Sequence, residues 1–156
     1  MNYKLWHTED IARRKDVTPC VTADCKYRID RLNQKRTDFY EKIDESIIEL
    51  LTPCLPEICR DVQNTESPGM AVDRMSILAL KIYHMKEQAM RSDVGAEHIK
   101  TAKDKLQILE SQRHNLIKAV KHLIDEYLTG RKTLKAFYQM KMYNDPNLNP
   151  QLYGGR

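Results

Sequence analysis

The sequence predicts an all-α protein folded as an antiparallel bundle of four main helices plus a C-terminal helix. Of its 156 residues, 31% are charged and 41% apolar, with five glycines and six prolines. This mixture is typical of long helices with charged outer faces. Apolar residues also recur at spacings of three and four along most of the chain, as on one face of a helix, and no segment has the alternation of a strand.

The N-terminal half predicts two helices. The first covers about residues 3–15 and ends at Val17-Thr18-Pro19, because proline fixes φ and removes a backbone donor. The second covers about residues 22–51 and ends at Thr52-Pro53, with a short helical turn expected at 57–62. Its apolar stripe consists of Ile29, Leu32, Tyr40, Ile43, Ile47 and Leu50.

The next two helices have clear ends. Ser67-Pro68 predicts the start of the third, with serine as the N-cap and proline at the first helical position. This helix runs to about Arg91 and is apolar over most of its circumference, which predicts a central position in the bundle. The tight link at 92–95 predicts an antiparallel neighbour over 96–128. Thr129-Gly130 ends that fourth helix, since glycine readily takes the left-handed conformation.

A last helix is expected over about residues 132–142, followed by turns at Asn144-Asp145-Pro146 and Asn149-Pro150. The chain is therefore divided into one helical-bundle domain, residues 1–142, and an extended C-terminal tail, residues 143–156.

Composition narrows the classes of function. The net charge of +4 is mild, and the basic runs at 13–15 and 131–135 lack the aromatic interleaving or motif of a nucleic-acid reader. No apolar run approaches the roughly 20 residues of a membrane span. The N-terminus has no apolar stretch with a small-residue cleavage site. We therefore expect a cytoplasmic protein that spans no membrane and does not bind nucleic acid.

The four cysteines form two C-x4-C pairs, Cys20/Cys25 and Cys54/Cys59. The helix predicted between the pairs would hold them roughly 40 Å apart. Thiolates that share a zinc ion must lie about 2.3 Å from it, so both pairs cannot serve one site. Ordinary reduced thiols are the better interpretation.

Two arginines interrupt the apolar stripes. Arg36 lies between Leu32 and Tyr40 in the second helix, and Arg113 lies between Leu109 and Leu116 in the fourth. Arginine is rarely buried without a partner, so two such positions on facing helices indicate an anion between them. The anion is either protein, with Asp44 and Asp73 in a structural ion-pair network, or a ligand phosphate or carboxylate held by the guanidinium groups.

The third helix has a polar stripe beside its apolar face. This polar stripe consists of Arg74, Lys81, His84 and Gln88. A lysine and a histidine in so apolar a helix indicate a functional site, with Lys81 and His84 as catalytic candidates. The alternative is that both side chains extend to solvent at the edge of the bundle.

A third group could bind a metal ion. His7, Glu9 and Asp10 lie together on the first helix, and His84 lies three residues before Glu87. These residues are weak metal-ligand candidates, because the paired Glu-x-x-His motifs of di-iron bundles are absent. Glu9 and Asp10 are also catalytic candidates. The chain has no Gly-rich phosphate loop, nucleophile elbow or Cys–His signature, so no cofactor is expected.

Four segments resemble a bacterial family known as domain of unknown function 4254: residues 5–13 (Leu-Trp-His-Thr-Glu-Asp-Ile-Ala-Arg), 28–38, 73–85 and 141–150. They include Trp6, Asn33 and most of the polar residues above, but none of the cysteines. The resemblance implies a small helical protein that begins closer to its Trp-His motif than its relatives do. It also implies a link to glycosyltransferases of cell-surface glycan synthesis, since such proteins are often encoded beside them.

Three hypotheses of function follow. The first is that the protein binds, or acts on, a small anionic metabolite such as a nucleotide sugar or sugar phosphate. The ligand-binding candidates are Trp6, His7, Asn33, Arg36, Arg74, Lys81 and Arg113. The second is a non-enzymatic partner that forms a homodimer or docks on a glycosyltransferase. The third is a metal-dependent hydrolase. The sequence does not decide whether the protein is an enzyme.

Overall fold

The computed structural model describes residues 1–154, which contain helices but no strand; 69% of the chain is helical. The elements are α1 (Asn2–Ala12), α2 (Pro19–Leu51), a 3₁₀ turn (Thr52–Cys54), α3 (Pro68–Ala89), α4 (Ala96–Leu128) and the short α5 (Pro150–Tyr153). The prediction of an all-α bundle with four main helices is confirmed. No helix in the described residues is long and apolar enough to cross a membrane.

Local capping chemistry sets the ends of the long helices. The hydroxyl of Thr18 accepts from the Val21 amide at 3.5 Å, ahead of Pro19 at the start of α2. Ser67 likewise accepts from the Met70 amide at 3.3 Å ahead of Pro68. Gly130 follows α4 with a φ of +67°, the left-handed conformation that glycine adopts without strain. The start of α3 and the end of α4 agree with the prediction, whereas α2 begins at Pro19, earlier than the predicted start at about residue 22.

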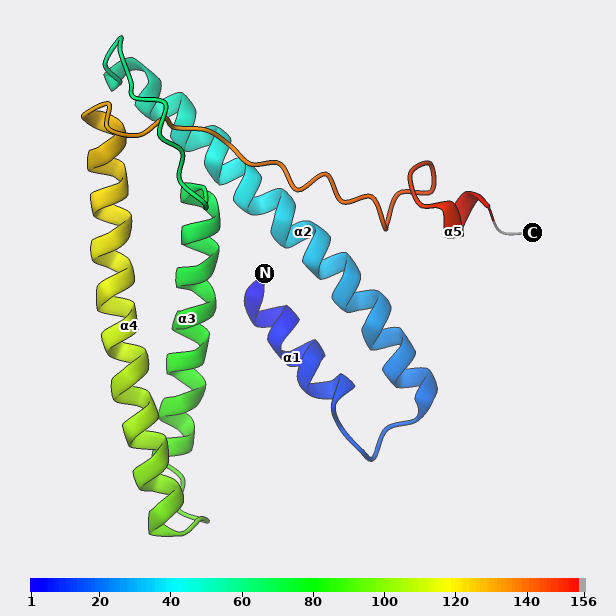
Figure 1. Cartoon of the computed structure of the whole chain (residues 1–156). Coiled ribbons are helices and arrows are strands. Elements are labelled where there is room, and N and C mark those ends of the chain that lie inside the picture. The colour runs from blue at the N-terminus through cyan, green and yellow to red at the C-terminus, as the bar shows by residue number, and fades with distance from the viewer. Residues whose placement is uncertain (155–156) are drawn as a thin grey trace.

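The helices form two hairpins that meet at α2 and α3. Figure 1 shows α3 and α4 side by side and antiparallel, with α2 leaning across the upper end of α3 and α1 beneath α2. The crossing of α2 and α3 is close at Gly69, where a Cβ atom would lie only 2.1 Å from the carbonyl oxygen of Tyr40. Farther along, α2 diverges from the α3–α4 hairpin, so the bundle is open on the side of α1.

The buried core is small for a chain of this length. Among residues 1–154, eight apolar side chains are buried, all of them on helices: Cys25, Ile29, Tyr40, Ala71, Ile82, Ala102, Leu123 and Tyr127. Three of them come from α4, which packs mainly against α3. Only a narrow strip of α4 is therefore covered.

The helix expected over residues 132–142 is not present, and neither is the turn expected at 57–62. The reason lies in the backbone hydrogen bonds that these two segments make with each other. The Arg60 amide donates to the Gly130 carbonyl at 2.8 Å, and the Thr133 amide donates to the Val62 carbonyl at 2.9 Å. Backbone N–H and C=O groups that would pair within a helix therefore form hydrogen bonds between these two segments instead.

Residues 133–154 form an extended segment, which we call the C-terminal arm. It crosses α2, where the Gln139 amide donates to Glu41 Oε1 at 2.9 Å and Lys141 Nζ donates to the Asn33 carbonyl at 3.1 Å. Beyond this point the arm leaves the helical body and ends in α5 (Figure 1). The proposed division of the chain at residue 142 stays a prediction.

Candidate functional site

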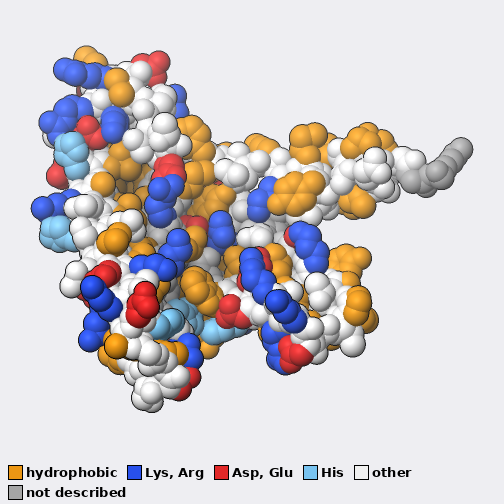
Figure 2. Space-filling view, turned by 60° about the horizontal axis from the view of Figure 1, so that its bottom comes forward, with side chains coloured by type: hydrophobic (Ala, Val, Ile, Leu, Met, Phe, Trp, Pro, Cys, Tyr) orange, Lys and Arg blue, Asp and Glu red, His pale blue; other side chains and the backbone are white. Residues whose placement is uncertain are grey.

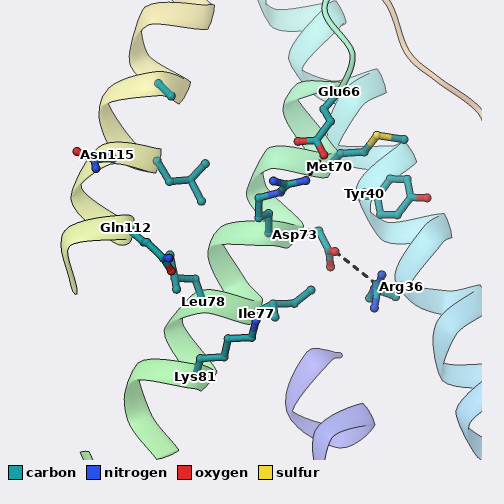
Figure 3. A pocket seen from close by; sticks show the side chains of 13 residues that line it. Arg36, Tyr40, Glu66, Met70, Asp73, Ile77, Leu78, Lys81, Gln112 and Asn115 are labelled. Carbon is teal, nitrogen blue, oxygen red and sulfur yellow. Dashed lines mark hydrogen bonds and ion pairs between the residues drawn. The ribbon is translucent and has the colours of Figure 1, made fainter. Parts of the chain in front are cut away.

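A cavity of about 860 Å³ lies between α2, α3 and α4, at the place where α2 begins to diverge. We call it the cation cavity, because three of the basic residues that the sequence singled out meet in it (Figure 3). Its lining residues are Arg36 and Tyr40 from α2; Glu66 just before α3; Met70, Asp73, Arg74, Ile77, Leu78 and Lys81 from α3; and Gln112, Asn115, Leu116 and Ala119 from α4.

Arg36 is paired with an acidic residue of the protein. Its Nε lies 3.4 Å from Asp73 Oδ2, and the side chains are 32% and 13% exposed, respectively. Asp73 Oδ1 also accepts a hydrogen bond of 2.9 Å from the side-chain carboxamide of Asn2, so Asp73 joins α1, α2 and α3. Of the two acidic residues considered as partners, Asp44 and Asp73, Asp73 therefore forms an ion pair with Arg36. The distance of 3.4 Å is longer than that of a strong charge-assisted hydrogen bond.

Arg74 and Lys81 differ in their pairing. Arg74 forms an ion pair with Glu66 at the mouth of the cavity. Lys81, two turns farther along α3, forms no ion pair with any carboxylate in residues 1–154, and Figure 3 shows its side chain extending along the cavity wall past Ile77. Three cations and two carboxylates line the cavity, which leaves one positive charge in excess.

The opposite wall of the cavity, on α4, is uncharged. Gln112 and Asn115 present carboxamides, and Leu116 and Ala119 supply an apolar floor between them. Carboxamides both donate and accept hydrogen bonds, so they can pair with hydroxyl groups of a ligand. The cavity thus has one basic wall and one neutral polar wall.

A further basic residue, Lys141, was not among the site residues inferred from the sequence. It reaches α2 from the C-terminal arm and donates to the Asn33 carbonyl, while Arg36 Nη1 lies 3.5 Å from Asn33 Oδ1. Burial lowers the pKa of Lys141, and the nearby charge of Arg36 lowers it further. No local pattern marks this lysine, because its place depends on the path of the arm across α2.

Trp6, His7 and His84 form an aromatic cluster between α1 and α3. The Trp6 and His84 rings stack with centroids 4.7 Å apart and an interplanar angle of 15°, and His7 meets His84 edge-on at 5.4 Å. His84 Nδ1 lies 2.7 Å from Glu87 Oε2, whereas its Nε2 is buried with no partner among the described residues. A second cavity of about 450 Å³ adjoins this cluster and shares Lys81 with the first.

The remaining predicted polar residues line a further cavity beside α1. A cavity of about 470 Å³ between α1, α2 and α3 is lined in part by Trp6, Glu9, Asp10, Asn33 and Arg36. Glu9 pairs with Arg13 one turn later, and Asp10 Oδ2 lies 3.3 Å from His7 Nδ1. Arg36 lines both this cavity and the cation cavity, so the predicted residues of α1 and α2 are brought close together.

The metal-ligand candidates do not assemble into a site. His7 and Asp10 form one pair, and His84 and Glu87 form another. Within residues 1–154, no group of three or more His, Cys, Asp or Glu side chains lies close enough to hold a metal ion. The four cysteines are free thiols, and Cys25 is buried in the core. This geometry gives a metal-dependent reaction no support.

The expectation that Arg113 occupies a core position was wrong. Its side chain is exposed on α4 and does not line the cation cavity, although its neighbours Gln112 and Asn115 do. Helical spacing placed Arg113 correctly on the stripe of Leu109 and Leu116. Because α4 packs mainly against α3, the stripe is not buried along its whole width. Of the four Arg and Lys residues among the predicted ligand-binding residues, Arg36, Arg74 and Lys81 line the cation cavity and Arg113 does not.

Comparison with known proteins places the chain in a family. The family described as "Protein of unknown function (DUF4254)" matches residues 1–136, which include α1 to α4 and the lining residues of the cation cavity. No curated protein and no solved structure matches the chain. The resemblance is confirmed over the Trp-His segment and the blocks at 28–38 and 73–85, whereas the block at 141–150 lies beyond the matched residues. The chain belongs to this family of proteins of unknown function.

Proposed function

We propose that this protein binds a small anionic metabolite, such as a sugar phosphate or nucleotide sugar, in the cation cavity. The observation that carries the proposal is Lys81, an ammonium group with no acidic partner in residues 1–154, in a cavity that Arg36 and Arg74 also line. A ligand phosphate would supply the negative charge that the cavity lacks. Charge-assisted hydrogen bonds of this kind are about twice as strong as neutral ones.

The size and the two walls of the cavity support the same class of ligand. Its volume of about 860 Å³ falls within the roughly 300–1,000 Å³ that is usual for small-molecule sites. The carboxamides of Gln112 and Asn115 line the α4 side of the cavity and suit sugar hydroxyls, while Lys81 and the arginines suit a phosphate. A role in bacterial cell-surface glycan synthesis is part of this proposal and rests on the family resemblance.

Of the catalytic candidates, His84, Lys81 and Asp10 line the smaller cavity beside the cation cavity. Lys81 lines both the cation cavity and the smaller cavity beside His84. Glu87 orients the His84 ring through Nδ1, which leaves Nε2 free to accept a proton if Trp6 moves away. Binding requires no such movement, so we propose binding as the function and assign no reaction.

The test compares Lys81→Met with Lys118→Met, which removes an exposed ammonium from α4 outside the cavity. The probes are glucose 1-phosphate, UDP-glucose, inorganic phosphate and uncharged glucose. We expect at least one anion to raise the melting temperature of the wild type and of Lys118→Met, and to leave Lys81→Met unchanged. The proposal fails if no anion stabilises the wild type, or if Lys81→Met responds as strongly as Lys118→Met.

A further inference from the structure

The single chain exposes far more surface than a compact protein of its size. Its accessible surface is 11,282 Å², and its mass is 18.3 kDa. A compact monomer of that mass exposes roughly 8,100 Å². The excess is about 3,000 Å² per chain, or roughly 6,000 Å² for two chains, which is enough to supply the roughly 2,000–5,000 Å² that permanent dimers bury in total.

Much of the apolar part of this surface lies on the C-terminal arm. Figure 2 shows hydrophobic side chains gathered along the arm where it projects from the body. The exposed large apolar residues of its outer part are Met140, Met142, Tyr143, Leu148, Leu152 and Tyr153. No hydrogen bond or ion pair links residues 142–153 to a helix of the bundle. An isolated monomer would leave this apolar segment in water.

The backbone at Met140 directs the arm outward. Its φ of +45° places it in the left-handed region, which is costly for a residue with a side chain. The neighbours on both sides are anchored to α2, Gln139 through Glu41 and Lys141 through Asn33. Met140 itself is 75% exposed. The hydrogen bonds of Gln139 and Lys141 therefore hold Met140 in a strained conformation with its side chain in solvent. The flexible, polarizable side chain of methionine is suited to a protein interface.

The charge of the arm favours a second copy of the chain as the partner. A two-fold contact places the same patch of both chains together, so a charged patch would meet like charges. The whole chain carries 26 basic and 22 acidic residues, but the twelve residues 142–153 carry one charge, Asp145. This segment can therefore meet its own copy with little repulsion.

We propose that the protein is a homodimer in which Met140 and residues 142–153 of each chain pack against the other chain. The arm leaves the cation cavity of its own chain uncovered, since its contacts with the body lie on α2 and on residues 60–62. Dimerisation is thus independent of the proposed ligand binding, and either one can fail without the other.

Sedimentation velocity of the full chain between about 1 and 100 μM tests the proposal, because the population of a dimer depends on concentration. The wild type is expected at twice 18.3 kDa. The double variant Met140→Glu/Leu152→Glu places like charges in the contact and is expected to weaken dimerisation at least about 100-fold. Hydrogen exchange should show protected amides within residues 143–153 of the wild type, and this protection should be lost in the double variant.

The matched control is Met90→Glu, which adds the same charge at a methionine that is 79% exposed at the far end of the α3–α4 hairpin (Figure 1). It should remain dimeric, and circular dichroism should show unchanged helicity in all three proteins. A wild type that is monomeric throughout the concentration range would overturn the proposal. So would an arm variant that dimerises as tightly as Met90→Glu, because the contact would then lie elsewhere.

Discussion

The backbone amide of Gly69 donates a hydrogen bond of 2.6 Å to Oδ1 of Asp44, and this contact joins the first turn of α3 to the C-terminal part of α2. Both residues are buried, and Asp44 Oδ2 has no partner among the described residues. The absence of a side chain at Gly69 lets the two backbones approach this closely. The crossing of α2 and α3 that opens the cation cavity therefore depends on this pair.

Gly69→Ala should destabilise the protein by about 3 kcal/mol or more, because the added Cβ would lie 2.1 Å from the Tyr40 carbonyl oxygen and one of the helices must shift. Gly95→Ala is the control, since nothing lies within 4 Å of a Cβ at that helix N-cap. Its cost should stay below about 1 kcal/mol. Urea unfolding followed by circular dichroism measures both, and equal costs would contradict the close approach at Gly69.

Asp44 should make stability fall as the pH rises above the acidic range. Burial raises the pKa of Asp44, so the folded protein holds this proton more tightly than the unfolded chain does. The stability it contributes is complete below the unfolded pKa of about 3.9 and is lost as the pH rises through the folded pKa. The Asp44→Asn variant lacks this loss, and so it should gain stability relative to the wild type as the pH rises.

Urea unfolding of both proteins at a series of pH values above about 4 measures the trend at Asp44. Because other titrating groups contribute equally to both proteins, the difference in unfolding free energy isolates this carboxyl. Asp104→Asn, at an exposed position on α4, controls for the loss of one negative charge. If the wild type instead becomes more stable relative to Asp44→Asn as the pH rises, the pKa of Asp44 is not raised in the folded protein and the prediction is wrong.

Arg36→Met and Arg113→Met should differ sharply, although the sequence places both residues on apolar stripes. Arg36→Met leaves the half-buried Asp73 without its cation and should cost about 1–2 kcal/mol, between the values for exposed and buried pairs. Arg113→Met alters an exposed residue and should change stability by less than about 0.5 kcal/mol. Adding Asp73→Asn to Arg36→Met should recover part of the loss, which a double-mutant cycle measures.

The same two arginine variants separate ligand binding from structure. An anion at a hundred times its dissociation constant stabilises the wild type by about 2.7 kcal/mol. Arg113→Met should keep this stabilisation, because Arg113 does not line the cation cavity, and Arg36→Met should lose most of it. Equal responses of the two variants would place the anion outside the cavity.

Trp6→Ala should loosen α1, because the stack of Trp6 on His84 is a principal contact between α1 and α3. We expect a loss of about 2–3 kcal/mol for this half-buried ring, less than for a fully buried one. Tyr3→Ala removes an exposed ring from the same helix and should cost less than about 1 kcal/mol. Trp6 is the only tryptophan, so circular dichroism must follow unfolding, and hydrogen exchange should become faster across α1.

The sequence by itself determined the helices whose ends have local chemistry. Ser67-Pro68 and Thr129-Gly130 set the start of α3 and the end of α4, because capping depends on residues within one turn of the boundary. Periodicity also put Arg36, Arg74 and Lys81 on faces that meet in one cavity. The family assignment could likewise be made from the sequence, since it depends on residue identity alone.

Only the tertiary structure decided which faces are covered and where the C-terminal arm runs. Spacing tells which residues share a face of a helix, but burial depends on a second element, and α4 has one main neighbour, so Arg113 stays exposed. The backbone beyond Gly130 pairs with residues 60–62, about seventy positions earlier, instead of forming the helix that its apolar residues suggested. Lys141 reaches Asn33 for the same reason. Contacts between residues so distant in sequence leave no local pattern by which they could be predicted.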